Sequence, residues 1–197
     1  MAAKLDIWNM ALGFIGTRTV ASESERTPEA VQCALFWDSA RRTALRDYPW
    51  NFAQTRARLA EVAMPEAWAG EWRHAYVPPD RCLRLHRVLG AGGRAGFMPV
   101  HDAEREIVLT DAADALADYT RDVAEPSRWD DAFRMVMARR LACLICAPLL
   151  KNNAGKVQEL ESLYRAALPD AMQSDASERE ERAEPDAWLL ARGGFDR

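Results

Sequence analysis

Four cysteines and three histidines are the residues of this 197-residue sequence best suited to metal binding, redox chemistry or nucleophilic catalysis. Cys143 and Cys146 form a C-x-x-C motif, but the motif lies within a predicted helix and no second cysteine pair accompanies it. His74, His86 and His101 are each isolated among predicted strand residues, without the i, i+4 partner of a metal site. We therefore expect reduced cysteines of a cytosolic protein and no metal site.

A glycine-rich stretch at residues 90–96 is the nearest approach to a phosphate-binding loop. It lacks the Lys-Ser/Thr ending of such loops and leads into a strand-like segment instead of a helix. A flexible hairpin tip is the better interpretation. Ser127 suits a helix cap, and no pair of carboxylates stands out as a catalytic acid and base. The sequence thus predicts a protein that is not an enzyme, with no catalytic, cofactor-binding or metal-binding residue and no cofactor.

Composition and charge restrict the partners that the chain can bind. The chain has 26 basic and 30 acidic residues and a net charge of −4, which argues against a strongly basic nucleic-acid-binding face. Lys4 and Asp6 interrupt any signal peptide, and the longest apolar run, 141–150, contains Pro148 and is too short to span a bilayer. We expect no membrane partner.

Periodicity divides the chain into helical ends and a strand-rich middle. Apolar residues recur at helical spacing before residue 48 and again after residue 130, whereas short alternating segments separated by turns occupy the middle third. The predicted fold is α+β, mainly α: a helical bundle with an inserted small antiparallel β meander and an extended C-terminal tail. The predicted domains are a helical body of residues 1–53 and 126–174, a β-rich insertion of residues 54–125, and a charged spacer with a C-terminal anchor tail at residues 175–197.

The joint between helices and strands lies at residues 48–53, which we call the signature corner. Pro49 forces Tyr48 out of helical geometry and ends the preceding helix. Trp50 and Phe52 alternate with Asn51, a pattern that predicts an extended segment placing two aromatic side chains in one core. Tyr48, Pro49, Trp50 and Phe52 are therefore expected to be structural residues.

The C-terminal tail combines a charged spacer with a short apolar segment. Residues 174–186 are almost wholly polar, and Trp188, Leu189 and Leu190 follow them, with Phe195 near the end. An apolar triad beyond a charged spacer does not easily belong to the core of its own chain. The tail is held by another chain or by a neighbouring copy, or it folds back on the body.

The order of these motifs resembles a known family, the tail tubular protein A and head-completion (adaptor) proteins of tailed bacteriophages. The resemblance covers roughly residues 5–175. The residues that carry it are Asn9-Met10-Ala11-Leu12 with Gly16; Ala30, Cys33 and Arg41; Leu45 to Ala53; Arg56 and Leu59; Trp72 to Tyr76; Val77-Pro78-Pro79-Asp80-Arg81-Cys82-Leu83-Arg84; Thr110-Asp111; Tyr119; Phe133; Leu141-Ala142; Leu160; and Tyr164.

The resemblance implies a structural virion protein of the tail or neck, assembled in the host cytoplasm. Such adaptors form a homo-oligomeric ring, commonly of twelve copies, beneath the portal protein, and they offer a platform for tail tube or nozzle proteins. Genomic DNA passes through the ring channel without sequence-specific binding. The resemblance makes Trp188, Leu189, Leu190 and Phe195 the expected portal anchor. The alternative is a nucleic-acid-binding packaging accessory protein, with Arg41, Arg42, Arg46, Arg56 and Arg58 as its basic stripe.

Overall fold

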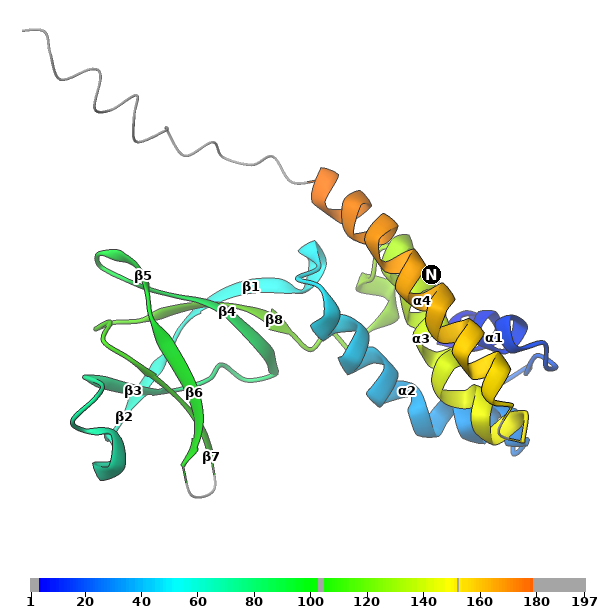
Figure 1. The fold of residues 1–197 in the computed structure, drawn as a ribbon, viewed down its shortest axis with the longest axis horizontal. Helices are drawn as coiled ribbons and strands as arrows, with labels where there is room; N and C mark the ends of the chain where they lie inside the picture. The colour runs from blue at the N-terminus through cyan, green and yellow to red at the C-terminus, as the bar shows by residue number, and fades with distance from the viewer. Residues whose placement is uncertain (1–3, 103–104, 152, 179–197) are drawn as a thin grey trace, which may run out of the picture.

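The computed structural model describes residues 4–102, 105–151 and 153–178. Helices and strands gather on opposite sides of the molecule in Figure 1. The helices are α1 (Lys4–Ile15), α2 (Pro28–Asp47), α3 (Asp131–Leu149) and α4 (Ala154–Ser177), with short 3-10 turns at Asn51–Ala53, Glu66–Trp68 and Pro126–Arg128. The strands are β1 (Gln54–Arg58), β2 (Ala60–Val62), β3 (His74–Val77), β4 (Cys82–Gly90), β5 (Gly93–Ala95), β6 (Phe97–Asp102), β7 (Arg105–Thr110) and β8 (Leu116–Arg121).

The helices begin and end where local chemistry satisfies their free backbone groups. Thr27 caps α2 by accepting a hydrogen bond from the N–H of Ala30 at 3.3 Å, and Pro28 occupies the first helical position. Asp130 caps α3 in the same way through the N–H of Phe133 at 2.6 Å. Gly16 ends α1 with a φ of +76°, a conformation that favours glycine.

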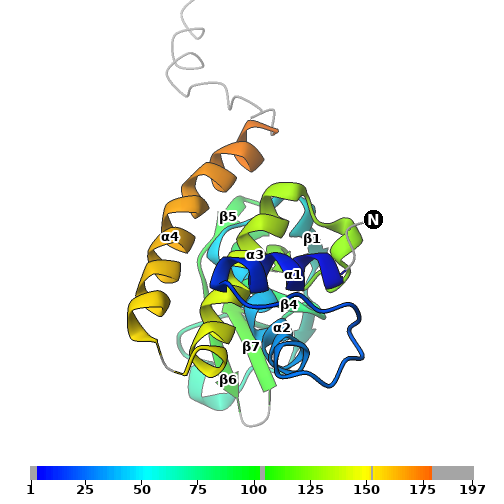
Figure 2. The ribbon, with the colours of Figure 1, turned by 90° about the vertical axis from the view of Figure 1, so that its right-hand side faces the viewer.

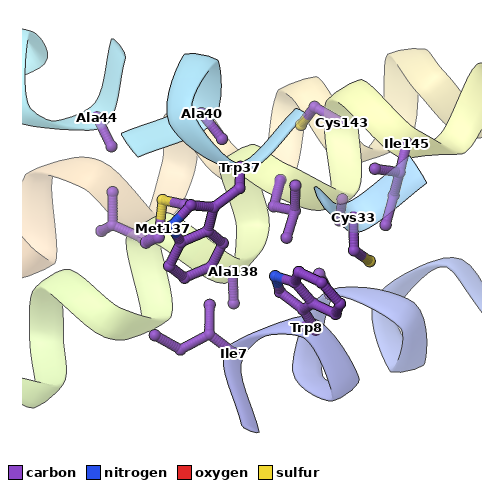
Figure 3. Close-up of a cluster of buried hydrophobic side chains, with 14 of the residues drawn as sticks. Ile7, Trp8, Cys33, Trp37, Ala40, Ala44, Met137, Ala138, Cys143 and Ile145 are labelled. Carbon is purple, nitrogen blue, oxygen red and sulfur yellow. The ribbon is translucent and has the colours of Figure 1, made fainter. Parts of the chain in front are cut away.

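Helix α3 is the centre of the helical body and packs against α1, α2 and α4. Figure 2 shows α1 crossing α3, with α4 lying along one side. The core is apolar and dense: Trp8 of α1, Trp37 of α2 and Met137 of α3 are buried together (Figure 3). Because α1 and α2 precede the strands and α3 and α4 follow them, the helical core joins two parts of the chain that are separated in sequence by the strands.

The strands form two four-stranded antiparallel sheets, with strand orders β1-β8-β4-β5 and β2-β3-β7-β6. The prediction of a small meander is therefore wrong. Strand β1 passes into β2 through Leu59, whose N–H donates to the carbonyl of Ala115 at 2.8 Å. Strand β5 passes into β6 at Gly96, whose carbonyl accepts from the Thr110 hydroxyl at 2.7 Å. Strands β1 and β2 thus form one bent strand that runs from the first sheet into the second, and β5 and β6 form another. Within the described residues, the pairing of strands therefore continues around a closed ring. We call residues 54–121 the β-unit.

The β-unit contains an apolar layer on each face of its second sheet. Tyr76 and Val108 point into the space between the sheets, where they meet Val88 of β4. Ile107 and Leu109 alternate to the opposite face, which Trp68 and other side chains of the β2–β3 connection cover. The β-unit therefore has a core of its own, separate from that of the helices.

Candidate functional site

The signature corner is the packing centre of the helical body. Trp50 is fully buried, and its ring N–H donates to the carbonyl of Ala44 at 2.9 Å. Its ring meets those of Tyr48 and Phe133 edge-on, each at a centroid distance of 5.1 Å. Phe52 is half-buried and contacts Phe133 at 5.0 Å. The contacts with Phe133 connect the corner, at the end of α2, to the start of α3.

The backbone of the corner differs from the expected extended segment. Residues 51–53 form a 3-10 turn, and the N–H groups of Ala53 and Gln54 both donate to the carbonyl of Trp50 at 3.0 Å. The turn places Trp50 and Phe52 against the same ring of Phe133, which an alternating strand would also have done. Alternation of large and small residues over so short a stretch does not distinguish the two conformations.

The corner also holds the last turn of α4, through a contact that the sequence pattern does not predict. The Asn51 N–H donates to the carboxylate of Asp175 at 2.9 Å, and the Asn51 side chain donates to the Asp175 carbonyl at 2.5 Å. Asp175 is buried although it lies at the start of the predicted charged spacer. Helix α4 continues to Ser177, so the first residues of that spacer belong to the folded body.

The histidines and cysteines do not assemble into a reactive centre. Within the described residues, no group of three or more His, Cys, Asp or Glu side chains is placed to hold a metal ion. Cys143 and Cys146 lie on α3 in the helical core, and burial raises the pKa of Cys143 to about 11 and also raises that of Cys146. Their thiols are therefore protonated and unreactive at neutral pH.

Two of the three histidines, His74 and His86, have structural partners. His74 lies 2.7 Å from the Glu61 carboxylate, and His86 lies 2.7 Å from the Thr120 hydroxyl. At the glycine-rich stretch, β4 and β5 pair from Gly90 with Gly93, so its first half is a hairpin tip. None of the described helices is long and apolar enough to cross a membrane.

Ion pairs neutralise three of the five arginines proposed as a basic stripe. Arg41 is buried and forms a two-pronged contact with Asp122, at 2.9 and 3.1 Å, besides a 2.6 Å contact with Asp38. Arg56 pairs with Asp118 and Arg58 with Asp114. The stripe is therefore reduced to Arg42 and Arg46, which lie one turn apart on α2.

The Arg56–Asp118 pair gives the β-unit a testable dependence on pH. The hydrogen bond from Arg56 is the main cause that lowers the pKa of Asp118 below its ordinary value of 3.8, and Arg87 contributes. A lowered pKa in the folded state means that the carboxylate stabilises the fold above pH 3.8. This stabilisation is lost as the pH falls through the lower folded-state value.

Asp118→Asn is expected to lower the free energy of unfolding by about 1 kcal/mol near neutral pH and to leave it unchanged in strong acid. Urea unfolding at a series of pH values measures both. Asp114→Asn is the matched control, because the Arg58–Asp114 pair is exposed on both sides and should contribute little. A variant curve parallel to the wild-type curve at all pH values would contradict this assignment.

A hollow between α2 and the β-unit is lined by exposed arginines. Arg42 and Arg46 come from α2 and Arg84 from β4, and the hollow encloses about 260 Å³. The Arg84 guanidinium donates to the carbonyl of Arg46 at 3.0 Å, which joins the two elements. We call this feature the arginine hollow. The sequence analysis placed Arg42 and Arg46 in the basic stripe but did not include Arg84. The separation of residues 42, 46 and 84 along the chain gives no sign that they are close in space.

Cys82 also lines the arginine hollow, and the pKa of its thiol depends on the charged side chains around it. Burial raises the pKa of Cys82 to about 11; Glu106 adds to the rise, and Arg46 opposes it. Arg46 and Glu106 are therefore both close enough to act on one thiol. With three arginines and one glutamate along its lining, the hollow carries a net charge of +2.

The predicted portal anchor, made of Trp188, Leu189, Leu190 and Phe195, lies outside the described residues. The described part of the chain before it ends with α4, whose last turn contacts the signature corner through Asp175. Comparison of the chain with protein-family models and with curated proteins gives no match.

Proposed function

We propose that this chain is a structural virion protein, a head–tail connector adaptor that forms a ring under the portal, extends the DNA channel and supports tail proteins. The observation that carries the proposal is the signature corner. The residues of the family-like segment, Tyr48 to Ala53, join α2 to α3 and hold the end of α4, and among the described residues no possible metal-binding cluster lies around them. A motif whose residues serve packing alone suits a protein whose task is assembly.

Exposed apolar side chains on the helical body support contacts between neighbouring copies. Val31 and Leu35 lie one helical turn apart on α2 and are 50% and 66% exposed. Each contact of this kind is small, but a closed ring repeats it around the symmetry axis. The helical body is thus the part of the chain that we assign to the ring.

The remaining roles follow from the same proposal. Trp188, Leu189, Leu190 and Phe195 bind a groove of the portal protein, which lets a short apolar segment act as the anchor of each copy. Tail tube or nozzle proteins bind the opposite side of the ring, and DNA passes through the channel without sequence-specific contacts. The alternative, a nucleic-acid-binding packaging accessory protein, has less support, because only Arg42 and Arg46 of its stripe remain without an ion pair among the described residues.

The mass of the particle formed with portal protein tests the proposal. Purified chain mixed with portal rings is expected to give one complex whose mass equals a portal ring plus a ring of adaptor copies, commonly twelve. Native mass spectrometry measures the mass and the stoichiometry together. Portal rings that keep their own mass in the presence of excess chain would refute the adaptor function.

A further inference from the structure

The arginine hollow is lined by both basic and apolar residues, a combination that suits a peptide carrying both acidic and small apolar side chains. Leu83 and Leu85 of β4 lie at the hollow together with Phe97 and Pro99 of β6. Arg42 and Arg46 stand on the α2 side.

The cationic side chains of the hollow have no carboxylate partner within the described part of the chain. Ion pairs occupy Arg41, Arg56 and Arg58, but no described carboxylate lies within ion-pair distance of Arg42, Arg46 or Arg84. The hollow therefore has positive charge that remains free to attract an acidic segment.

The sequence that follows α4 has the complementary charge. Residues 178–186 contain five acidic residues and two arginines, a net charge of −3. In an extended segment, Glu184 and Asp186 fall on one side, whereas Ala183, Pro185 and Ala187 fall on the other. This alternation suits a lining that contains both basic and apolar residues.

The distance along the chain allows this segment to reach the hollow of its own copy. Asp175 is hydrogen-bonded to Asn51, which is five residues from Arg46, so at most about 18 Å of backbone separates Asn51 from Arg46. Six residues of extended chain after Glu178 span about 20 Å, which brings Glu184 to the hollow.

We propose that the acidic segment 180–187 docks in the arginine hollow of the same chain, with Glu184 and Asp186 against Arg42 and Arg46. The docked segment fixes the point at which Trp188 leaves the body. This docking is independent of whether Trp188 binds a portal, so its failure and the failure of the adaptor function are distinguishable.

Photocrosslinking in the full-length protein tests the docking. With p-benzoylphenylalanine in place of Ala187, irradiation is expected to join position 187 to residues 82–85 or 97–99 without forming a dimer, and mass spectrometry of the peptides maps the link. The double variant Arg42→Glu/Arg46→Glu is expected to lower the yield about fivefold, since it replaces two attractive pairs by repulsive ones. Raising the salt concentration should also lower the crosslink yield of the protein with Arg42 and Arg46 unchanged.

A matched control separates the hollow from general charge effects. Arg94→Glu/Arg105→Glu makes the same change in net charge at exposed positions of the β-unit outside the hollow and should leave the yield unchanged. Adding Glu184→Lys/Asp186→Lys to the Arg42→Glu/Arg46→Glu variant should restore the crosslink. Equal melting temperatures of the variants show that folding is intact.

Four results would overturn the proposal. Crosslinks scattered over the surface, or a yield insensitive to Arg42→Glu/Arg46→Glu, would show that the hollow does not hold the segment. Links that produce a dimer would place the segment in a second copy. Binding of a short labelled DNA duplex that depends on Arg42 and Arg46 at about 150 mM salt would assign the hollow to nucleic acid.

Discussion

Trp50→Ala is expected to lower the free energy of unfolding by about 3–5 kcal/mol, enough to remove a large part of the stability of a domain of this size. Trp50 is fully buried, and its ring touches both Tyr48 and Phe133. Alanine would leave a cavity at the point where α2 and α3 meet, and the carbonyl of Ala44 would lose the hydrogen bond that it accepts from the ring N–H. Urea denaturation followed by circular dichroism measures the loss.

Trp50→Phe is the control that divides this loss into its parts. Phenylalanine keeps one aromatic ring in the site, removes the hydrogen bond to Ala44 and leaves a smaller cavity than alanine does, so we expect a smaller loss of about 1–2 kcal/mol. If Trp50→Ala lowered the free energy of unfolding by less than the amount expected for Trp50→Phe, the corner would not be the packing centre that its geometry indicates.

Removal of residues 179–197 is expected to abolish attachment to portal rings while the rest of the chain stays folded. Asp175 holds Asn51 and therefore has to remain, so the chain should end after Glu178 and not at residue 173 or 174. The free energy of unfolding is expected to change by no more than about 1 kcal/mol, because every buried residue of the described helical core lies before residue 179. Native mass spectrometry with portal protein measures the attachment.

A full-length variant with Trp188, Leu189 and Leu190 changed to alanine distinguishes the apolar anchor from the charged spacer before it. It should lose attachment as the truncated chain does, since hot-spot residues of this kind supply most of the binding energy. Substitution of Glu178 and Glu180 by glutamine, which leaves the triad intact, is the matched control and should retain binding. Portal attachment by the truncated chain would disprove the anchor role of the tail.

Local chemistry made the helix ends and most strand positions predictable. Thr27 and Pro28 specify the start of α2, Pro49 specifies its end, and Gly16 ends α1. These features act over one turn of helix, so the few residues around each position contain the information. The middle third, predicted to be rich in strands, contains all eight strands of the described residues, β1 to β8.

The closure of the sheets and the contacts of the corner could not be predicted in this way. Leu59 and Gly96 look like interruptions in the sequence, yet they are the bends at which one strand passes from one sheet to the other. The contact between Asn51 and Asp175 joins residues 124 positions apart. The arginine hollow likewise depends on the approach of α2 to β4, which only tertiary packing sets.

The entry and exit of the β-unit lie side by side, because Gln54 of β1 pairs with Thr120 of β8. Cα atoms opposite each other in an antiparallel pair are about 5 Å apart, so a short linker between Ala53 and Asp122 could close the helical body without the insert. A unit with its own core and adjacent ends can be lost, exchanged or enlarged in evolution while the helices keep their packing. Divergence of this chain is therefore expected to be fastest in the β-unit and slowest around Trp50.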